Sequence, residues 1–121
     1  MKTVTLSLLA LALLAVSGPS AAETLTCTPS KKFYCSPEGC KTVPAKVRAV
    51  IDTDKQTYSR CDRNGCDKYD ATVSMGGIYL NVLVPGKSVT AKVEFPSLQY
   101  LEVASLGLGM YASYGRCKSK K

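Results

Sequence analysis

The stretch IYLNVLVPGKSVTAKVEF, residues 78–95, gives the clearest indication of the fold. Apolar residues occupy every second position on both sides of Pro85-Gly86-Lys87. This alternation is typical of β-strands with one buried face, and Pro and Gly favour a turn between them. The segment therefore predicts two antiparallel strands packed on a core. The inward positions expected are Ile78, Leu80, Val82 and Val84, then Val89, Ala91, Val93 and Phe95.

The same period continues in both directions along the chain. Residues 45–52 and 68–74 alternate between apolar and polar, while residues 99–106 and 110–117 are apolar on both faces. We therefore predict an all-β protein, an antiparallel up-and-down meander of seven or eight strands. It either closes into a small barrel or folds over as a two-layer β-roll, and we favour the barrel because closure removes the edge strands.

The first 22 residues have the three parts of a secretory signal peptide. Lys2 is followed by an almost wholly apolar run at 4–16, and Ser20-Ala21-Ala22 supplies the small residues before a cut at Glu23. The apolar run is too short for a membrane span. We expect residues 1–22 to be cleaved and 23–121 to form one β domain with a short basic C-terminal tail. The expected location is the periplasm or the extracellular medium.

Six cysteines in a short exported chain indicate three disulfides, although six cysteines allow 15 connectivities. Residues 35–40 and 61–66 share one layout, with turn-forming residues between two cysteines. Facing residues at a hairpin end lie close enough for a disulfide, which favours Cys35–Cys40 and Cys61–Cys66. Cys27–Cys117 then follows by elimination. A glycine bulge would instead place Cys40 opposite Ser36.

The composition excludes several kinds of catalysis. The chain has no histidine, so a Ser-His-Asp triad, a Cys-His dyad and a histidine-ligated metal are impossible. Bridged cysteines offer no thiolate nucleophile. We therefore predict a protein that is not an enzyme and has no cofactor or metal.

Two groups of residues are candidates for binding. The formal net charge is +7, and a Cys27–Cys117 bridge would gather cations from both chain ends into one anion-binding region. The tyrosines of the last strand, and the turn between Cys61 and Cys66, supply candidates for a protein interface. The anion-binding candidates are Lys31, Lys32, Arg116, Lys118, Lys120 and Lys121. The interface candidates are Arg60, Arg63, Asn64, Tyr111 and Tyr114.

Parts of the second half of the chain resemble a group of small exported bacterial proteins of unknown function, which implies no activity. The segments that carry the likeness are Tyr58-Ser59-Arg60-Cys61-Asp62, Gly65-Cys66-Asp67, Glu102-Val103-Ala104-Ser105-Leu106-Gly107 and Gly115-Arg116-Cys117.

The size, export signal and meander are also loosely similar to the small barrel inhibitors of c-type lysozyme in bacterial envelopes. Ser74, Gly76, Gly77 and Tyr79 correspond only partly to that family's serine-glycine loop. Its tryptophan-lysine-glycine strand is missing because the chain has no tryptophan. Such lysozymes are also basic, so like charges would weaken a complex.

Two functions remain as expectations. The first is a non-catalytic exported binding protein that contacts a protein or an anionic surface component. The second is an inhibitor of a host or competitor hydrolase that presents a disulfide-closed hairpin, since a pre-organised loop loses little entropy on binding. No specific nucleic-acid recognition and no transmembrane segment are expected.

Overall fold

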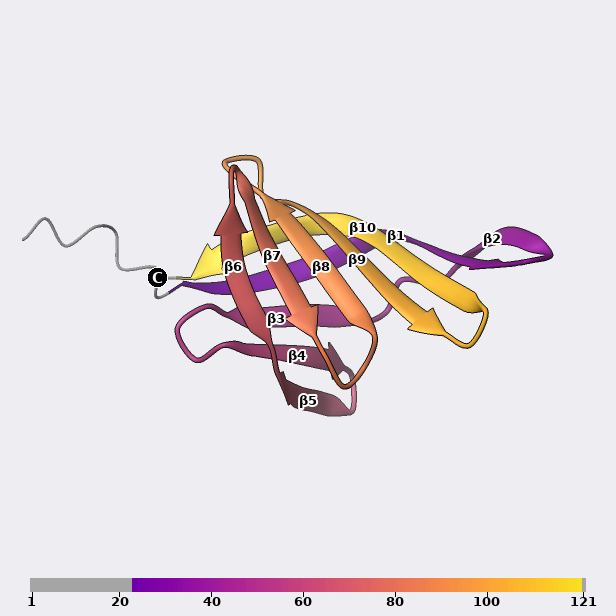
Figure 1. Ribbon diagram of the computed structural model, residues 1–121, viewed down its shortest axis with the longest axis horizontal. Helices are drawn as coiled ribbons and strands as arrows, with labels where there is room; N and C mark the ends of the chain where they lie inside the picture. The colour runs from indigo at the N-terminus through magenta and orange to yellow at the C-terminus, as the bar shows by residue number, and fades with distance from the viewer. Residues whose placement is uncertain (1–22, 121) are drawn as a thin grey trace, which may run out of the picture.

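The computed structural model describes residues 23–120, which contain ten β-strands and no helix. The strands form one antiparallel sheet that curls into a nearly closed barrel (Figure 1). The predicted signal peptide, residues 1–22, and Lys121 lie outside the described residues. The strands are β1 (Thr24–Ser36), β2 (Gly39–Val43), β3 (Arg48–Asp52), β4 (Thr57–Asp62), β5 (Gly65–Asp70), β6 (Thr72–Gly76), β7 (Tyr79–Val84), β8 (Val89–Glu94), β9 (Gln99–Leu106) and β10 (Gly109–Lys120).

Strand β1 lies between β3 and β10 in the sheet order β5-β4-β3-β1-β10-β9-β8-β7-β6. One edge of β1 pairs with β10. Its other edge pairs with β3 through residues 24–27 and with β2 through residues 32–36, so β3 and β2 follow one another along the same edge. The β1–β2 hairpin therefore extends beyond the rest of the sheet (Figure 1). The predicted antiparallel β-barrel is confirmed. The described residues form ten strands and not the seven or eight expected, because both cysteine segments form hairpins of their own.

The predicted strand 68–74 is interrupted, which corrects the sequence analysis. Strand β5 ends at Asp70 and β6 begins at Thr72, and these two strands are the ends of the sheet order. Tyr69, Ala71 and Val73 all pack against the core, so the alternation continues through the corner and gives no sign of it.

Gln56 bridges the seam at this corner. Its carbonyl accepts from the Ala71 N–H at 3.0 Å. Its side chain accepts from the Val73 N–H at 2.8 Å through Oε1 and donates from Nε2 to the Val73 carbonyl at 3.2 Å. The amide of Gln56 thus replaces a backbone pairing where the two sheet edges separate.

The three disulfides are Cys27–Cys117, Cys35–Cys40 and Cys61–Cys66, the pairs that the sequence favoured. The first joins β1 to β10 and is buried, while the other two close hairpins. The alternative glycine bulge is absent from both hairpins, because Gly39 lies opposite Ser36 and Gly65 lies opposite Asp62. Both glycines have a φ of 127°, a conformation that other residues rarely adopt.

The core fills the inside of the barrel and includes the buried disulfide between β1 and β10. Leu25, Ile51, Val82 and Val93 are each at most 2% exposed there. The inward positions predicted for the strand pair 78–95 are confirmed from Leu80 to Val93. Ile78 was predicted to share that face and is instead 54% exposed, because it lies in the turn before β7 begins at Tyr79.

Candidate functional site

An irregularity in β1 determines which cations face inward. The register between β1 and β10 shifts between Pro29 and Lys31, leaving Ser30 as a bulge. A bulge adds one residue and so exchanges the faces of all residues that follow it. Lys31 therefore lies on the outer face, whereas its neighbour Lys32 lines a cavity inside the barrel mouth.

Gly115 allows the two strands to approach closely at this bulge. It lies opposite Pro29, and a Cβ added to it would come within 2.1 Å of the Thr28 carbonyl oxygen and 2.6 Å of the Pro29 Cα. These obstacles are backbone atoms, so they cannot move aside without moving the strand. A glycine is therefore required on β10 opposite the bulge of β1.

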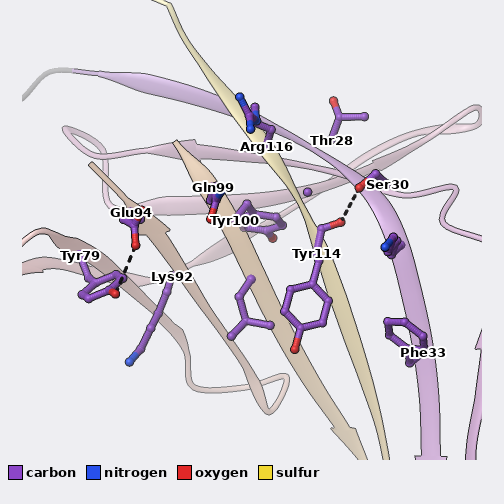
Figure 2. Close-up of a pocket in the computed structure, with 13 residues that line it drawn as sticks. Thr28, Ser30, Phe33, Tyr79, Lys92, Glu94, Gln99, Tyr100, Tyr114 and Arg116 are labelled. Atoms are coloured by element: carbon purple, nitrogen blue, oxygen red, sulfur yellow. Dashed lines mark hydrogen bonds between the residues drawn. The ribbon is translucent and has the colours of Figure 1, made fainter. Parts of the chain in front are cut away.

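The first candidate site is a groove of about 1020 Å³ on the outer face, which we call the outer groove. Residues from β1, β7, β8, β9 and β10 line it (Figure 2). Its lining combines three cations with four aromatic residues. These seven residues are Lys31, Lys92 and Arg116, and Phe33, Tyr79, Tyr100 and Tyr114.

The aromatic rings of the outer groove are held by specific contacts. The rings of Phe33 and Tyr114 meet edge to face, with centroids 6.3 Å apart. The Tyr114 carbonyl accepts from Ser30 Oγ at 3.3 Å, which ties the groove to the bulge (Figure 2). On the opposite side, Lys92 Nζ lies 5.7 Å from the centre of the Tyr79 ring. The groove thus presents aromatic surfaces next to positive charge.

One acidic residue, Glu94, lines the outer groove. Its carboxylate accepts from Tyr79 Oη at 3.3 Å and from Ser97 Oγ at 2.7 Å. Both bonds hold it at the edge beside Tyr79 (Figure 2). The lining therefore has an excess of positive charge, which favours an anionic ligand.

The predicted anion-binding residues are partly separated by the structure. Arg116, Lys118 and Lys120 occupy alternate positions of β10, opposite Thr28, Thr26 and Thr24 of β1, and all three are exposed. Lys31 lines the outer groove with Arg116. Lys32 faces the interior instead, because of the bulge, and Lys121 lies outside the described residues.

The second candidate site is a cavity of about 350 Å³ at the barrel mouth, which we call the polar chamber. Its lining contains charged side chains and aromatic rings. The charged residues are Lys32, Arg60, Lys87 and Glu102, and the rings are those of Tyr58, Tyr69 and Tyr111. Glu102 accepts a short hydrogen bond from Tyr58 Oη and another from Tyr100 Oη at 3.0 Å. Two strands far apart in the sequence therefore hold this carboxyl group.

Burial changes the proton affinities in the polar chamber. Desolvation raises the pKa of Glu102 from its ordinary 4.5 to about 7, although the positive charge of Lys32 opposes the rise. Desolvation and the nearby Arg60 lower the pKa of Lys32, while Glu102 opposes that change. Burial also raises the pKa of Tyr100. Glu102 can therefore exchange its proton near neutral pH.

Lys32 is also placed by an aromatic contact. Its Nζ lies 4.9 Å from the centre of the Tyr111 ring, which in turn packs against Tyr34 with centroids 4.9 Å apart. A cation over a ring face is stabilised by the quadrupole of the ring. This contact holds the ammonium group at the chamber while leaving its hydrogens available to a ligand.

The interface candidates fall at three places. Arg60 and Tyr111 line the polar chamber, and Tyr114 lines the outer groove, so the two tyrosines of β10 face opposite sides of the sheet. Arg63 and Asn64 form the exposed turn between β4 and β5, where the Asn64 N–H donates to Asp62 at 2.8 Å. The five candidates therefore do not share one surface.

Sequence reasoning missed Glu102, Tyr58 and Lys92. A signal for Glu102 was present in the sequence. At this position a charged residue stands between Tyr100 and Ala104 on the same face of a strand. Its partner Tyr58 lies in β4, 44 residues away in sequence, and no local pattern joins the two. Lys92 reads as an ordinary solvated strand residue, and only the fold places it in the same groove lining as Arg116.

Glu102 is the one carboxylate that lines the polar chamber, so the pair of carboxylates used in glycoside hydrolysis is missing from its described lining. Within residues 23–120, no group of three His, Cys, Asp or Glu side chains is arranged to hold a metal ion. The same part of the chain contains no helix of the length and hydropathy that a membrane span requires.

Comparison with known proteins found no matching family model, no matching curated protein and no matching solved structure. The function is therefore argued from the geometry of this chain.

Proposed function

We propose that this is a non-catalytic, exported binding protein whose outer groove holds a segment of an anionic polymer. The observation that carries the proposal is the convergence of Lys31, Lys92 and Arg116, from three strands, on one groove lined with aromatic rings. An acidic polysaccharide of the cell envelope has the chemistry that such a groove recognises. Its carboxylate or phosphate groups would pair with the cations, and its sugar faces would pack on the rings.

The shape of the groove favours a polymer over a membrane surface. At about 1020 Å³ it lies at the upper end of the range for ligand sites, and it is bounded by side chains of five strands. A bilayer is broad and meets protruding residues, whereas Tyr114 and Arg116 line a hollow. The cations Lys118 and Lys120 extend the positive surface from the groove along β10, which suits a chain that continues past the site.

The disulfides support an exported location. Three bridges and no free cysteine among the described residues are typical of an oxidising compartment. We propose the periplasm or the extracellular medium, where envelope polysaccharides are accessible. The signal peptide expected at residues 1–22 would deliver the chain there.

Charge reversal in the groove tests this function. We expect Lys92→Glu combined with Arg116→Glu to weaken binding to polygalacturonate, an acidic polysaccharide, at least about tenfold at low salt, since repulsion replaces two attractions. Isothermal titration calorimetry measures the affinity. The matched control is Lys55→Glu combined with Lys68→Glu, two exposed lysines outside the groove lining that change the net charge equally.

Two outcomes would contradict the proposal. Equal loss of affinity in the control would mean that net charge, and not the groove, attracts the polymer. Binding to vesicles that contain phosphatidylglycerol, with none to polygalacturonate, would assign the cations to a membrane surface.

An inhibitor of a hydrolase is the second candidate, and one observation favours it. The turn of Arg63 and Asn64 is exposed at the tip of a hairpin closed by Cys61–Cys66, so its shape is fixed before binding. Such an inhibitor would block its target when Arg63 is present and lose its effect in Arg63→Ala. Hydrolase assays with envelope extracts separate this function from polysaccharide binding, which the same variant leaves unchanged.

A further inference from the structure

We propose that the polar chamber is a second binding site, for a small molecule whose single oxyanion group, a carboxylate or a phosphate, lies between Lys32 and Arg60. This inference goes beyond the function of the outer groove, because the two sites lie on opposite faces of the sheet and differ in size. At about 350 Å³ the chamber is at the small end of the range for ligand sites. It is suited to a metabolite-sized ligand.

The chamber lining includes charged groups that a barrel interior normally excludes. Charged side chains inside a small barrel lose hydration, and apolar side chains would fill the same space without that cost. The Ser30 bulge nevertheless directs Lys32 inward, and strand β4 directs Tyr58 to the same cavity. Their convergence leaves a hollow lined with hydrogen-bond donors.

The polar chamber has more positive than negative side chains, which favours binding of an anion. Lys32, Arg60 and Lys87 line it as cations, and Glu102 is the one carboxylate in its described lining. Glu102 is already engaged by Tyr58 and Tyr100. Lys32 and Arg60 are near enough that the charge of Arg60 lowers the pKa of Lys32. An oxyanion between them would relieve this repulsion and pair with both donors.

Ligand affinity should depend on the protonation of Glu102. Its pKa near 7 means that it is largely neutral at pH 6 and largely charged at pH 8, where it would repel an anion. The charged groups around it are Lys32 on β1, Arg60 on β4, Asp67 opposite Arg60 on β5, and Lys87 in the β7–β8 turn. The phenols are Tyr58, Tyr69, Tyr100 and Tyr111.

The test is an NMR titration of the oxidised, isotope-labelled protein with benzoate and, separately, with inorganic phosphate. We expect saturable shifts at Lys32, Tyr58 and Arg60. For benzoate, whose charge is constant over this range, affinity should be about tenfold weaker at pH 8 than at pH 6. Binding of benzoate assigns a carboxylate with an apolar body, and binding of phosphate alone assigns a phosphate group. Glu102→Gln should remove the pH dependence while retaining binding, because an amide oxygen still accepts from both tyrosines.

Matched variants separate the chamber from the groove. Lys32→Met should weaken binding of these probes at least about tenfold, while Lys31→Met, its neighbour on the outer face, should leave it unchanged. Arg60→Met, at an exposed side chain, repeats the test if Lys32→Met does not fold. The groove variant Lys92→Glu with Arg116→Glu should bind the probes normally. No saturable shift with either probe, or unchanged affinity in both Lys32→Met and Arg60→Met, would overturn the inference.

Discussion

The interior of the barrel has two halves that share one strand pattern and differ in what fills them. In the packed half, Leu25, Cys27 and Val93 are fully buried. In the other half, the polar chamber, β1 contributes Lys32 and β9 contributes Glu102. The same strand β1 thus supplies apolar residues to one half and a cation to the other. The comparison indicates that one half stabilises the fold, so that the other is free to bind.

Burial of side chains has opposite effects on the free energy of folding in the two halves. Fully burying an aliphatic side chain stabilises a protein by about 1.5–3 kcal/mol. Partial burial of a carboxyl group costs free energy whenever the group is charged, and the raised pKa of Glu102 is a direct expression of this cost. The contacts of the packed half must therefore offset the free-energy cost of the polar chamber. Removing the disulfide of the packed half should have the largest effect on stability.

Replacing Cys27 and Cys117 together by alanine should lower the free energy of unfolding by about 4–5 kcal/mol. The bridge spans 90 positions in sequence and lies in the packed half, so its loss releases a long loop in the unfolded chain. Denaturation with guanidinium chloride, followed by circular dichroism, measures the change.

The control is the double replacement of Cys35 and Cys40, whose bridge spans five positions. On the same loop-entropy reasoning its removal costs about 2 kcal/mol. That hairpin extends beyond the sheet, so the packed half keeps its contacts. Equal losses in the two variants would contradict the idea that stability is concentrated in the packed half.

Part of the packed half was predictable from the sequence because its information is local. Alternation from Leu80 to Val93 defines both strands and their inward faces within one hairpin. The pairing Cys61–Cys66 follows from turn residues between two cysteines. Such features depend on neighbours a few residues apart, which a linear pattern records.

The polar chamber was not predictable because it depends on a bulge and on distant contacts. Alternation counted from Cys27 would place Lys31 and Phe33 inside, and Ser30 reverses that assignment. Nothing in the residues around Ser30 distinguishes a bulge from a regular strand. The same limitation hid the corner at Ala71, where the sheet turns although the alternation does not change.

The charge on Glu102 should make the whole protein less stable as the pH rises. Its folded pKa of about 7 exceeds the ordinary 4.5, so the folded state holds a proton that the unfolded state has released. Stability from this group is complete below pH 4.5 and falls as the pH rises to 7, by up to about 3 kcal/mol. Unfolding free energies measured from pH 4 to pH 8 give the slope.

Glu102→Gln should flatten this slope and be more stable than the parent protein at pH 8. Glu94→Gln is the matched control, since it removes the same charge from the outer groove. If both variants keep the slope of the parent, the cost of the polar chamber lies in another group. If Glu94→Gln alone flattens the pH dependence of stability, that dependence comes from the outer groove and not from the polar chamber.

The smallest expected effect separates two neighbouring lysines. The charge of Lys32 lowers the pKa of Glu102, so Lys32→Met should raise that pKa above 7, by about one unit. Lys31→Met removes the same charge one residue earlier and on the other face of the sheet, and it should leave the pKa unchanged. Carbon-detected NMR of the glutamate carboxyl groups measures both. Equal effects from the two lysines would mean that the bulge does not separate the faces in solution, and the contrast between the halves would lose its structural cause.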